Sequence, residues 1–231
     1  MSFGRYQFLP WVRRGIAKHI QEQDTLGSAS GSFDVRAQLD LSVGLSTGAT
    51  EDQTLSLVGP GDVVGIGARS MVRTEPRDGI TNFEPNLLPY VEFYDEDFPF
   101  RYTPASAANA ERHLRPWLML VVLKENEFIT SDRRTPLPSI TLVDDTVLPP
   151  AEELHLWAHV HSNLAHEESD LEAFIDGVEA DALTDPDGLY SRVLCPRRLE
   201  STTQYHAFLI PTYETGRRAG LGQPIDGVKA Q

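Results

Sequence analysis

The sequence feature that most restricts the fold is a strict alternation of apolar and polar residues between positions 35 and 45. Successive side chains of a β-strand point to opposite faces, so this period of two predicts a strand. The apolar members are Val35, Ala37, Leu39, Leu41, Val43 and Leu45. The residues between them include Arg36, Gln38, Asp40 and Ser42. We therefore expect β-structure with one apolar and one polar face.

A second strand is predicted at residues 117–123 (WLMLVVL), which are apolar on both faces, as in a strand at the centre of a protein. The 17 glycines and 16 prolines of the 231 residues interrupt helices and favour turns. Together these patterns predict a mainly β to α+β fold. We expect antiparallel strands, one or two short helices and long loops rich in proline and glycine.

Local patterns predict further strands. Strands are expected at residues 70–75 (SMVRTE) and 140–143, and in the segments SRVLCPRRLE (191–200) and QYHAFLIPTYE (204–214) on either side of a turn. Residues 154–161 alternate with Leu154, Leu156, Ala158 and Val160 inward, although a helix starting after Pro150 also fits them.

Helices are predicted at residues 107–114, with Ser106 as the cap, and within residues 169–183, with Ser169 as the cap. The glycines of GPGDVVGIG (59–67) predict a tight hairpin rather than a phosphate-binding loop. Residues 82–105, rich in proline and aromatics, predict an ordered extended segment lying across a sheet, and residues 216–227 a glycine-rich tail.

Charge divides the chain unevenly. The net charge is −14, which disfavours nucleic acid and anionic membrane surfaces as partners. Residues 1–20 nevertheless hold Arg5, Arg13, Arg14 and Lys18 and no acid. This predicts residues 1–34 as a basic docking arm with a flexible Gly/Ser-rich linker, residues 35–222 as one β-rich domain and residues 223–231 as a tail. A solvated first turn or two is the simpler alternative for the basic residues.

A single cysteine, Cys195, cannot form an internal disulfide, which indicates a reducing compartment. The N-terminal residues lack the apolar run of a signal peptide, and no stretch reaches the length of a transmembrane helix. We expect a cytoplasmic protein that does not insert into a membrane.

Two groups of residues are candidates for chemistry. His155, His159 and His161 share one face of the predicted strand and suggest a metal-dependent enzyme as the alternative function. Cys195 stands beside Arg197 and Arg198, whose charges favour a thiolate. Trp157 interrupts the histidines, no base accompanies the cysteine, and a lone cysteine in a strand is commonly a small buried hydrophobe. We therefore expect no enzyme activity and no cofactor.

Aromatic residues and arginines, which commonly anchor protein interfaces, crowd the proline-rich segments. The aromatics are Trp11, Phe83, Tyr90, Phe93, Tyr94, Phe98, Phe100, Tyr102 and Trp117. A core built from the same aromatics is an equally good explanation for any one of them. The residues we expect at a protein interface are Trp11, Arg13, Arg14, Lys18, Arg197 and Arg198.

A set of strings in order along the chain resembles structural proteins of phage-tail-like contractile injection systems. The strings include LPWVRRGIA (9–17), GPGDVVGI (59–66), LPYVEF (88–93), LRPWLMLVVL (114–123), LWAHV (156–160), LCPRRL (194–199), YHAFLIPTYE (205–214) and GRRAGLG (216–222). The resemblance implies a structural subunit at the cap or the baseplate of such a particle. Its partners would be sheath, tube, cap or baseplate subunits, with further copies of this chain arranged symmetrically.

Overall fold

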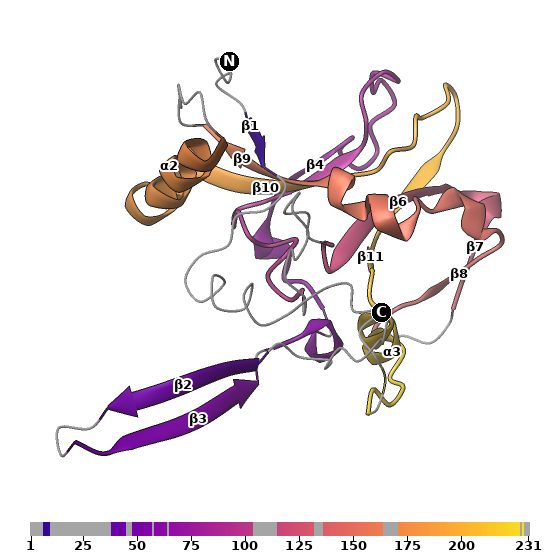
Figure 1. Ribbon diagram of the computed structural model, residues 1–231. Coiled ribbons are helices and arrows are strands. Elements are labelled where there is room, and N and C mark those ends of the chain that lie inside the picture. Colours follow the sequence, from indigo (N-terminus) through magenta and orange to yellow (C-terminus); the bar gives the residue numbers. More distant parts are fainter. Residues whose placement is uncertain are drawn as a thin grey trace.

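The computed structural model describes residues 7–9, 38–44, 48–56, 58–63, 65–103, 115–131, 136–163, 171–226 and 228. Antiparallel sheets dominate this part of the chain, with short helices between the strands (Figure 1). The predicted mainly β to α+β class is confirmed. The helix predicted at residues 107–114 lies outside the described residues.

The largest sheet has five antiparallel strands in the order β1-β9-β10-β5-β4. Their bounds are Gln7–Leu9 (β1), Ala158–Ser162 (β9), Leu189–Leu194 (β10), Tyr90–Phe93 (β5) and Met71–Glu75 (β4). Burial alternates along β10, where Leu189, Ser191 and Val193 are buried. These residues mark the face of the sheet that packs on the core. Because β1 pairs with β9, residues 7–9 of the predicted arm belong to this sheet.

A second sheet consists of β6 (Leu118–Lys124) and β11 (Tyr205–Pro211). Alternate residues of β6 belong to two hydrophobic clusters: Leu118, Leu120 and Val122 to the main core, and Met119, Val121 and Leu123 to a second cluster. Apolar side chains are needed on both faces because each face packs on a different cluster. This confirms the prediction of a central buried strand.

The aromatic segment after β5 fills the core. Phe93 stacks on Phe98 with ring centroids 4.4 Å apart, and Phe98 meets the edge of Trp117 at 5.8 Å. The indole nitrogen of Trp117 donates a 2.6 Å hydrogen bond to the carbonyl oxygen of Phe98. Residues 82–105 were predicted to lie across a sheet, but β5 is a strand within it. For Phe93, Phe98 and Phe100 the structure favours the core explanation.

Two α-helices are described. Helix α2 (Leu171–Thr184) confirms the helix predicted from its apolar spacing. Helix α3 (Glu214–Gly220) occupies part of the predicted tail, so that prediction was wrong. A side-chain Cβ at Gly216 would come 2.8 Å from Cβ of Pro211 and 3.4 Å from the carbonyl oxygen of Pro60. The glycine allows α3 to approach both segments closely.

Three predictions about connections also differ from the structure. The described residues of GPGDVVGIG, 59–63 and 65–67, form no hairpin; they contain the 3-10 helix Pro60–Asp62, and a second 3-10 helix, Ala68–Ser70, follows. β10 and β11 do not pair with each other, because β10 lies between β9 and β5 whereas β11 pairs with β6. Residues 154–161 begin as the 3-10 helix Ala151–Trp157 and become a strand only at Ala158. The helical alternative after Pro150 was the better description of that first part.

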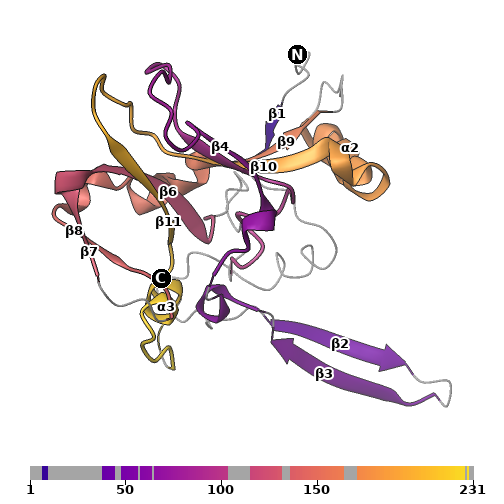
Figure 2. The same ribbon diagram turned by 180° about the vertical axis from the view of Figure 1, so that it is seen from behind.

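Two hairpins complete the described elements. β7 (Phe128–Thr130) pairs with β8 (Ile140–Leu142), close to the strand predicted at residues 140–143. β2 (Gln38–Gly44) pairs with β3 (Thr50–Ser56) and projects from the body of the molecule in both views (Figures 1 and 2).

Candidate assembly surfaces

The projecting β2–β3 hairpin is exposed at every residue of its strands whose burial the structure describes. Its two seven-residue strands run in register from Gln38 opposite Ser56 to Gly44 opposite Thr50. Residues 42–44 and 50–54 are exposed, and Val43 has 51% of its surface accessible. Within the described residues, β2 and β3 have no strand partner except each other. The hairpin therefore offers two outer strand edges to other molecules.

Sequence and pairing explain why this ribbon forms. The apolar-polar alternation gives β2 its period of two, whereas β3 is polar except for Leu55. Gly48 has a φ of 83°, which glycine adopts without steric cost near the turn. Ser42 donates a hydrogen bond across the pair to a carboxylate oxygen of Asp52. An isolated two-stranded hairpin is at best marginally stable in water. A contact with another surface would therefore stabilise it more than it would a strand already within a large sheet.

The hairpin is also acidic. Residues 38–56 contain Asp40, Glu51 and Asp52 and no lysine or arginine. The side chains of Glu51 and Asp52 are exposed. A partner surface with exposed arginines or lysines would complement this charge.

A polar groove with a cavity volume of about 840 Å³ lies over the outer face of the five-stranded sheet. Arg192 of β10 has its guanidinium 4.2 Å from the ring centroid of Tyr90 and 5.8 Å from that of Tyr190. It also donates hydrogen bonds of 2.6 and 3.2 Å to one carboxylate oxygen of Glu92. Arg73 of β4 donates a hydrogen bond to the hydroxyl of Tyr90.

These contacts have a structural role. They join β4, β5 and β10 through side chains on the face opposite the core, and Glu92 is buried between the two arginines. A buried carboxylate needs such partners, because an unpaired charge out of water is costly. The arrangement accounts for the charges of Arg192 and Glu92 without a substrate.

The histidines of the predicted metal site do not gather into one. His161 is 2% exposed and stacks on Tyr190, with ring centroids 4.9 Å apart and planes at 13°. Burial lowers its pKa to about 3, with smaller contributions from Arg192 and His159. His155 belongs to the preceding 3-10 helix. Among the residues that the structure describes, no group of three or more His, Cys, Asp or Glu side chains is placed to hold a metal ion.

The predicted orientation of this segment was partly wrong. Ala158 and Val160 are buried as expected, but Leu156 is 47% exposed, because it lies in the 3-10 helix and not in the strand. His161, expected on an outward face, is covered, because Tyr190 of β10 lies opposite it and stacks on it.

Cys195 follows β10 and is 4% exposed. Burial raises the pKa of its thiol and outweighs the opposing effects of hydrogen bonds from backbone groups and of the charge on Arg197. The protonated thiol is a poor nucleophile. Cys195 thus has the properties of a small buried apolar residue, which was the simpler of the two explanations.

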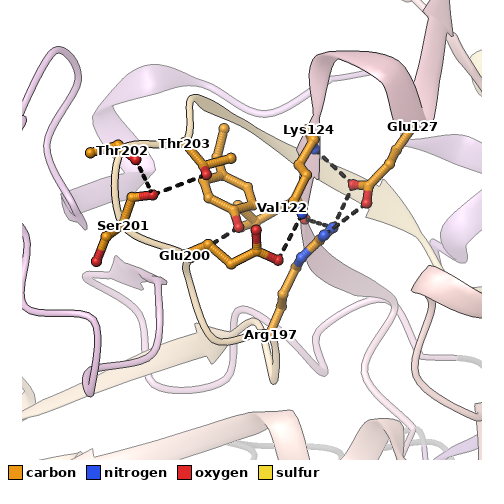
Figure 3. Close-up of polar contacts among 9 residues, drawn as sticks. Val122, Lys124, Glu127, Arg197, Glu200, Ser201, Thr202 and Thr203 are labelled. Carbon is orange, nitrogen blue, oxygen red and sulfur yellow. Dashed lines mark hydrogen bonds and ion pairs between the residues drawn. The ribbon is translucent and has the colours of Figure 1, made fainter.

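Arg197 was expected at a protein interface, and the structure places it in an internal ion pair. Its terminal nitrogens donate to the two carboxylate oxygens of Glu127 at 2.5 and 2.7 Å, and one also donates to the carbonyl oxygen of Val122 at 3.1 Å (Figure 3). Arg198, the next residue, is exposed. Trp11, Arg13, Arg14 and Lys18 lie outside the described residues, so their interface role stays a prediction.

Lys124 and Glu200 form a second ion pair beside this one, with a 2.7 Å separation between the lysine nitrogen and a carboxylate oxygen (Figure 3). The backbone nitrogen of Lys124 donates to Glu127 at 2.8 Å. These bonds fix the end of β6 against the loop that leaves β10.

The sequence matches no protein-family model, no curated protein and no solved structure. In the described part of the chain, no helix combines the length and the apolar character needed to span a bilayer. Function is therefore inferred from the residues and their geometry.

Proposed function

We propose that this protein is a structural subunit of a phage-tail-like contractile injection system, joining neighbouring subunits at the cap or the baseplate. The ordered series of strings described above supports the class of particle. The geometry supports the mode of action, because the exposed β2–β3 hairpin is suited to contact with protein. Among the described residues, no group of three or more His, Cys, Asp or Glu side chains is placed to hold the metal ion that the alternative enzyme would need.

The projecting β2–β3 hairpin is the observation that carries the proposal. Exposed strand edges are templates for pairing with another chain, and soluble proteins commonly shorten, cover or charge them. This ribbon has seven-residue strands, stands away from the body and exposes Val43. Such a ribbon is expected where a neighbouring subunit covers it in the assembled state.

The body of the molecule is well consolidated without a partner. The main core joins the five-stranded sheet to β6, and Arg197 and Glu127 fasten the loop after β10 to the end of β6. We infer that the body folds independently while projecting segments make the contacts. Repetition of one modest contact around a symmetric particle would secure the subunit through avidity.

The test is to replace residues 39–55 by a short Gly/Ser linker in otherwise full-length protein and to follow it into particles. We expect the variant to unfold at nearly the wild-type temperature but to be absent from purified particles, with its crosslinks to neighbouring subunits lost. The matched control replaces exposed Ile129 and Val143 by serine on the small β7–β8 side of the molecule. Incorporation of the hairpin variant at the wild-type level would rule out the hairpin as the joining element.

The basic N-terminal residues are tested in the same assay. Reversing charge with Arg13→Glu and Arg14→Glu is expected to impair incorporation while leaving the melting temperature unchanged. Crosslinking and mass spectrometry of the wild-type protein would identify its neighbours. Recovery of the protein without particle components, and with stoichiometric zinc or iron, would instead support the metal-dependent enzyme.

A further inference from the structure

Strand β4 forms an exposed edge of the five-stranded sheet. Within the described part of the chain, its one strand partner is β5. Val72, Arg73 and Thr74 are exposed, so one side of this strand faces solvent. An edge of this kind presents backbone donors and acceptors to an incoming strand.

The β4 edge is basic in an otherwise acidic protein. Arg69, Arg73 and Arg77 follow one another at intervals of four residues, and all three are exposed, Arg77 to 72% of its side chain. Residues 69–77 contain one acid, Glu75, whereas the whole chain has a net charge of −14. The charge of this edge is thus opposite to that of the hairpin, with its exposed Glu51 and Asp52.

We propose that the acidic β2–β3 hairpin of one copy pairs along the basic β4 edge of a second copy and extends its five-stranded sheet. Among the described residues, the hairpin pairs with no strand outside itself and β4 pairs with no strand except β5, and the charges of the two elements are complementary. Main-chain hydrogen bonds supply affinity in this mode of recognition, and side-chain charges set register and exclude wrong partners.

The placement of the two elements sets the geometry of the contact. The hairpin lies at the lower end of the molecule and β4 in its upper part, apart from each other in both views (Figures 1 and 2). A contact between different surfaces of two copies is heterologous, so it propagates into a closed ring or an open helical row. The inference rests on the proposed function, since it names a second copy of this chain as one neighbour in the particle.

Charge reversal tests the pairing. In full-length protein, Glu51→Lys with Asp52→Lys reverses the charge of the hairpin. Arg69→Glu with Arg77→Glu reverses the charge of the β4 edge. Arg73 is left intact because it binds Tyr90 and Glu92 within the sheet. Sedimentation velocity over a concentration series should show self-association of the wild type that weakens about ten-fold in either double variant.

The decisive sample is the quadruple variant, which carries both reversals. The proposal predicts that it regains self-association, as does an equimolar mixture of the two double variants. Hydrogen exchange measured in the same samples should slow at residues 71–75 and in the hairpin whenever association occurs, because their amides acquire partners. Raising the salt concentration should weaken association of the wild type.

Two results would overturn the inference. One is a wild-type protein that remains monomeric at all concentrations, in which case the arginines and the register shift between Met71 and Arg73 serve to protect the edge from pairing. The other is a quadruple variant that associates no better than the double variants. If hairpin removal still prevents incorporation into particles, the proposed function stands and the hairpin binds a different subunit; if it does not, both fail.

Discussion

Arg197 and Glu127 form a two-pronged ion pair between segments seventy residues apart in the sequence, with nitrogen–oxygen distances of 2.5 and 2.7 Å. Arg197 follows β10 of the five-stranded sheet, and Glu127 follows β6 of the two-stranded sheet. The additional bond from Arg197 to the carbonyl oxygen of Val122 reaches β6 itself. The pair therefore links the two sheets, and it accounts for an arginine that the sequence suggested was available for a partner.

Replacing Arg197 by alanine should lower the free energy of unfolding by about 2 kcal/mol, because Glu127 would keep its charge in a partly buried place without its main partner. Urea denaturation measures this loss. Arg198→Ala is the matched control, since its side chain is exposed, and should change stability by less than about 0.5 kcal/mol. Equal effects of the two substitutions would contradict a structural role specific to Arg197.

The ion pair between Arg197 and Glu127 also makes the free energy of unfolding depend on pH in the acidic range. The hydrogen bonds from Arg197 lower the pKa of Glu127 from 4.5 to about 2. A carboxylate with a lower pKa in the folded state stabilises the fold above its unfolded pKa, and that contribution is lost as pH falls from about 4.5 towards 2. The stability difference between wild type and Glu127→Gln should therefore shrink between pH 5 and about 2.5. A difference that stays constant over this range would show that the ion pair does not form.

His161 gives a second pH dependence, at higher pH. Its folded pKa of about 3 lies below the ordinary value of 6.5, so below pH 6.5 the unfolded chain takes up a proton that the folded protein excludes. The associated stability is present above pH 6.5 and is lost as pH falls. His161→Phe retains a ring beside Tyr190 and should flatten the stability profile between pH 6.5 and about 4. The free energy of unfolding is measured by urea denaturation at each pH. If it changes with pH in the variant as steeply as in the wild type, the proton is taken up by another group.

Adjacent aromatics in the sequence should differ sharply in their effect on stability. Phe93 is fully buried and stacks on Phe98, whereas Tyr94 is 61% exposed. Phe93→Ala should destabilise the fold by about 3–5 kcal/mol, through lost burial and the cavity left behind. Tyr94→Ala should cost less than about 1 kcal/mol. Thermal unfolding distinguishes the two variants. Similar melting temperatures would contradict the burial of Phe93 in the core.

The close approach of α3 predicts intolerance of a methyl group at Gly216. The alanine Cβ would lie 2.8 Å from Pro211, inside normal contact distance, so the segments must move apart at a cost of about 1–3 kcal/mol. Gly220→Ala, whose Cβ would lie 3.6 Å from a side-chain carbon of Leu137, is the control and should be tolerated. Calorimetry would contradict the packing if Gly216→Ala melted at or above the wild-type temperature.

Patterns that depend on neighbours in the sequence were sufficient to predict several elements. The apolar run at residues 117–123 predicted a strand buried on both faces, and each face of β6 does pack in a separate hydrophobic cluster. Apolar spacing located α2, and alternation located β2. The fold class followed from these elements together with the glycines and prolines.

Strand pairing could not be predicted in this way. β10 and β11 are close in the sequence, yet β10 pairs with β9 and β5, and β11 with β6. Which strands pair depends on which of their faces can be buried together, and those faces belong to segments far apart in the sequence. The same limit applied at the candidate site. The sequence predicted Arg197 at a protein interface because its partner Glu127 is seventy residues away. It predicted an outward His161 because Tyr190, which covers His161, comes from another strand. The four-residue spacing of Arg69, Arg73 and Arg77 was visible in the sequence, but its place on a sheet edge was not.

The direction of the β2–β3 ribbon has a mechanical consequence. Hydrogen bonds between antiparallel strands run perpendicular to the strands. Where the seven-residue ribbon pairs with a strand of a neighbouring subunit, a force along the strands loads all the hydrogen bonds between them simultaneously in shear, whereas a sideways force breaks them one after another. A subunit held by such a ribbon would resist tension along the strand axis and release readily when twisted away from it.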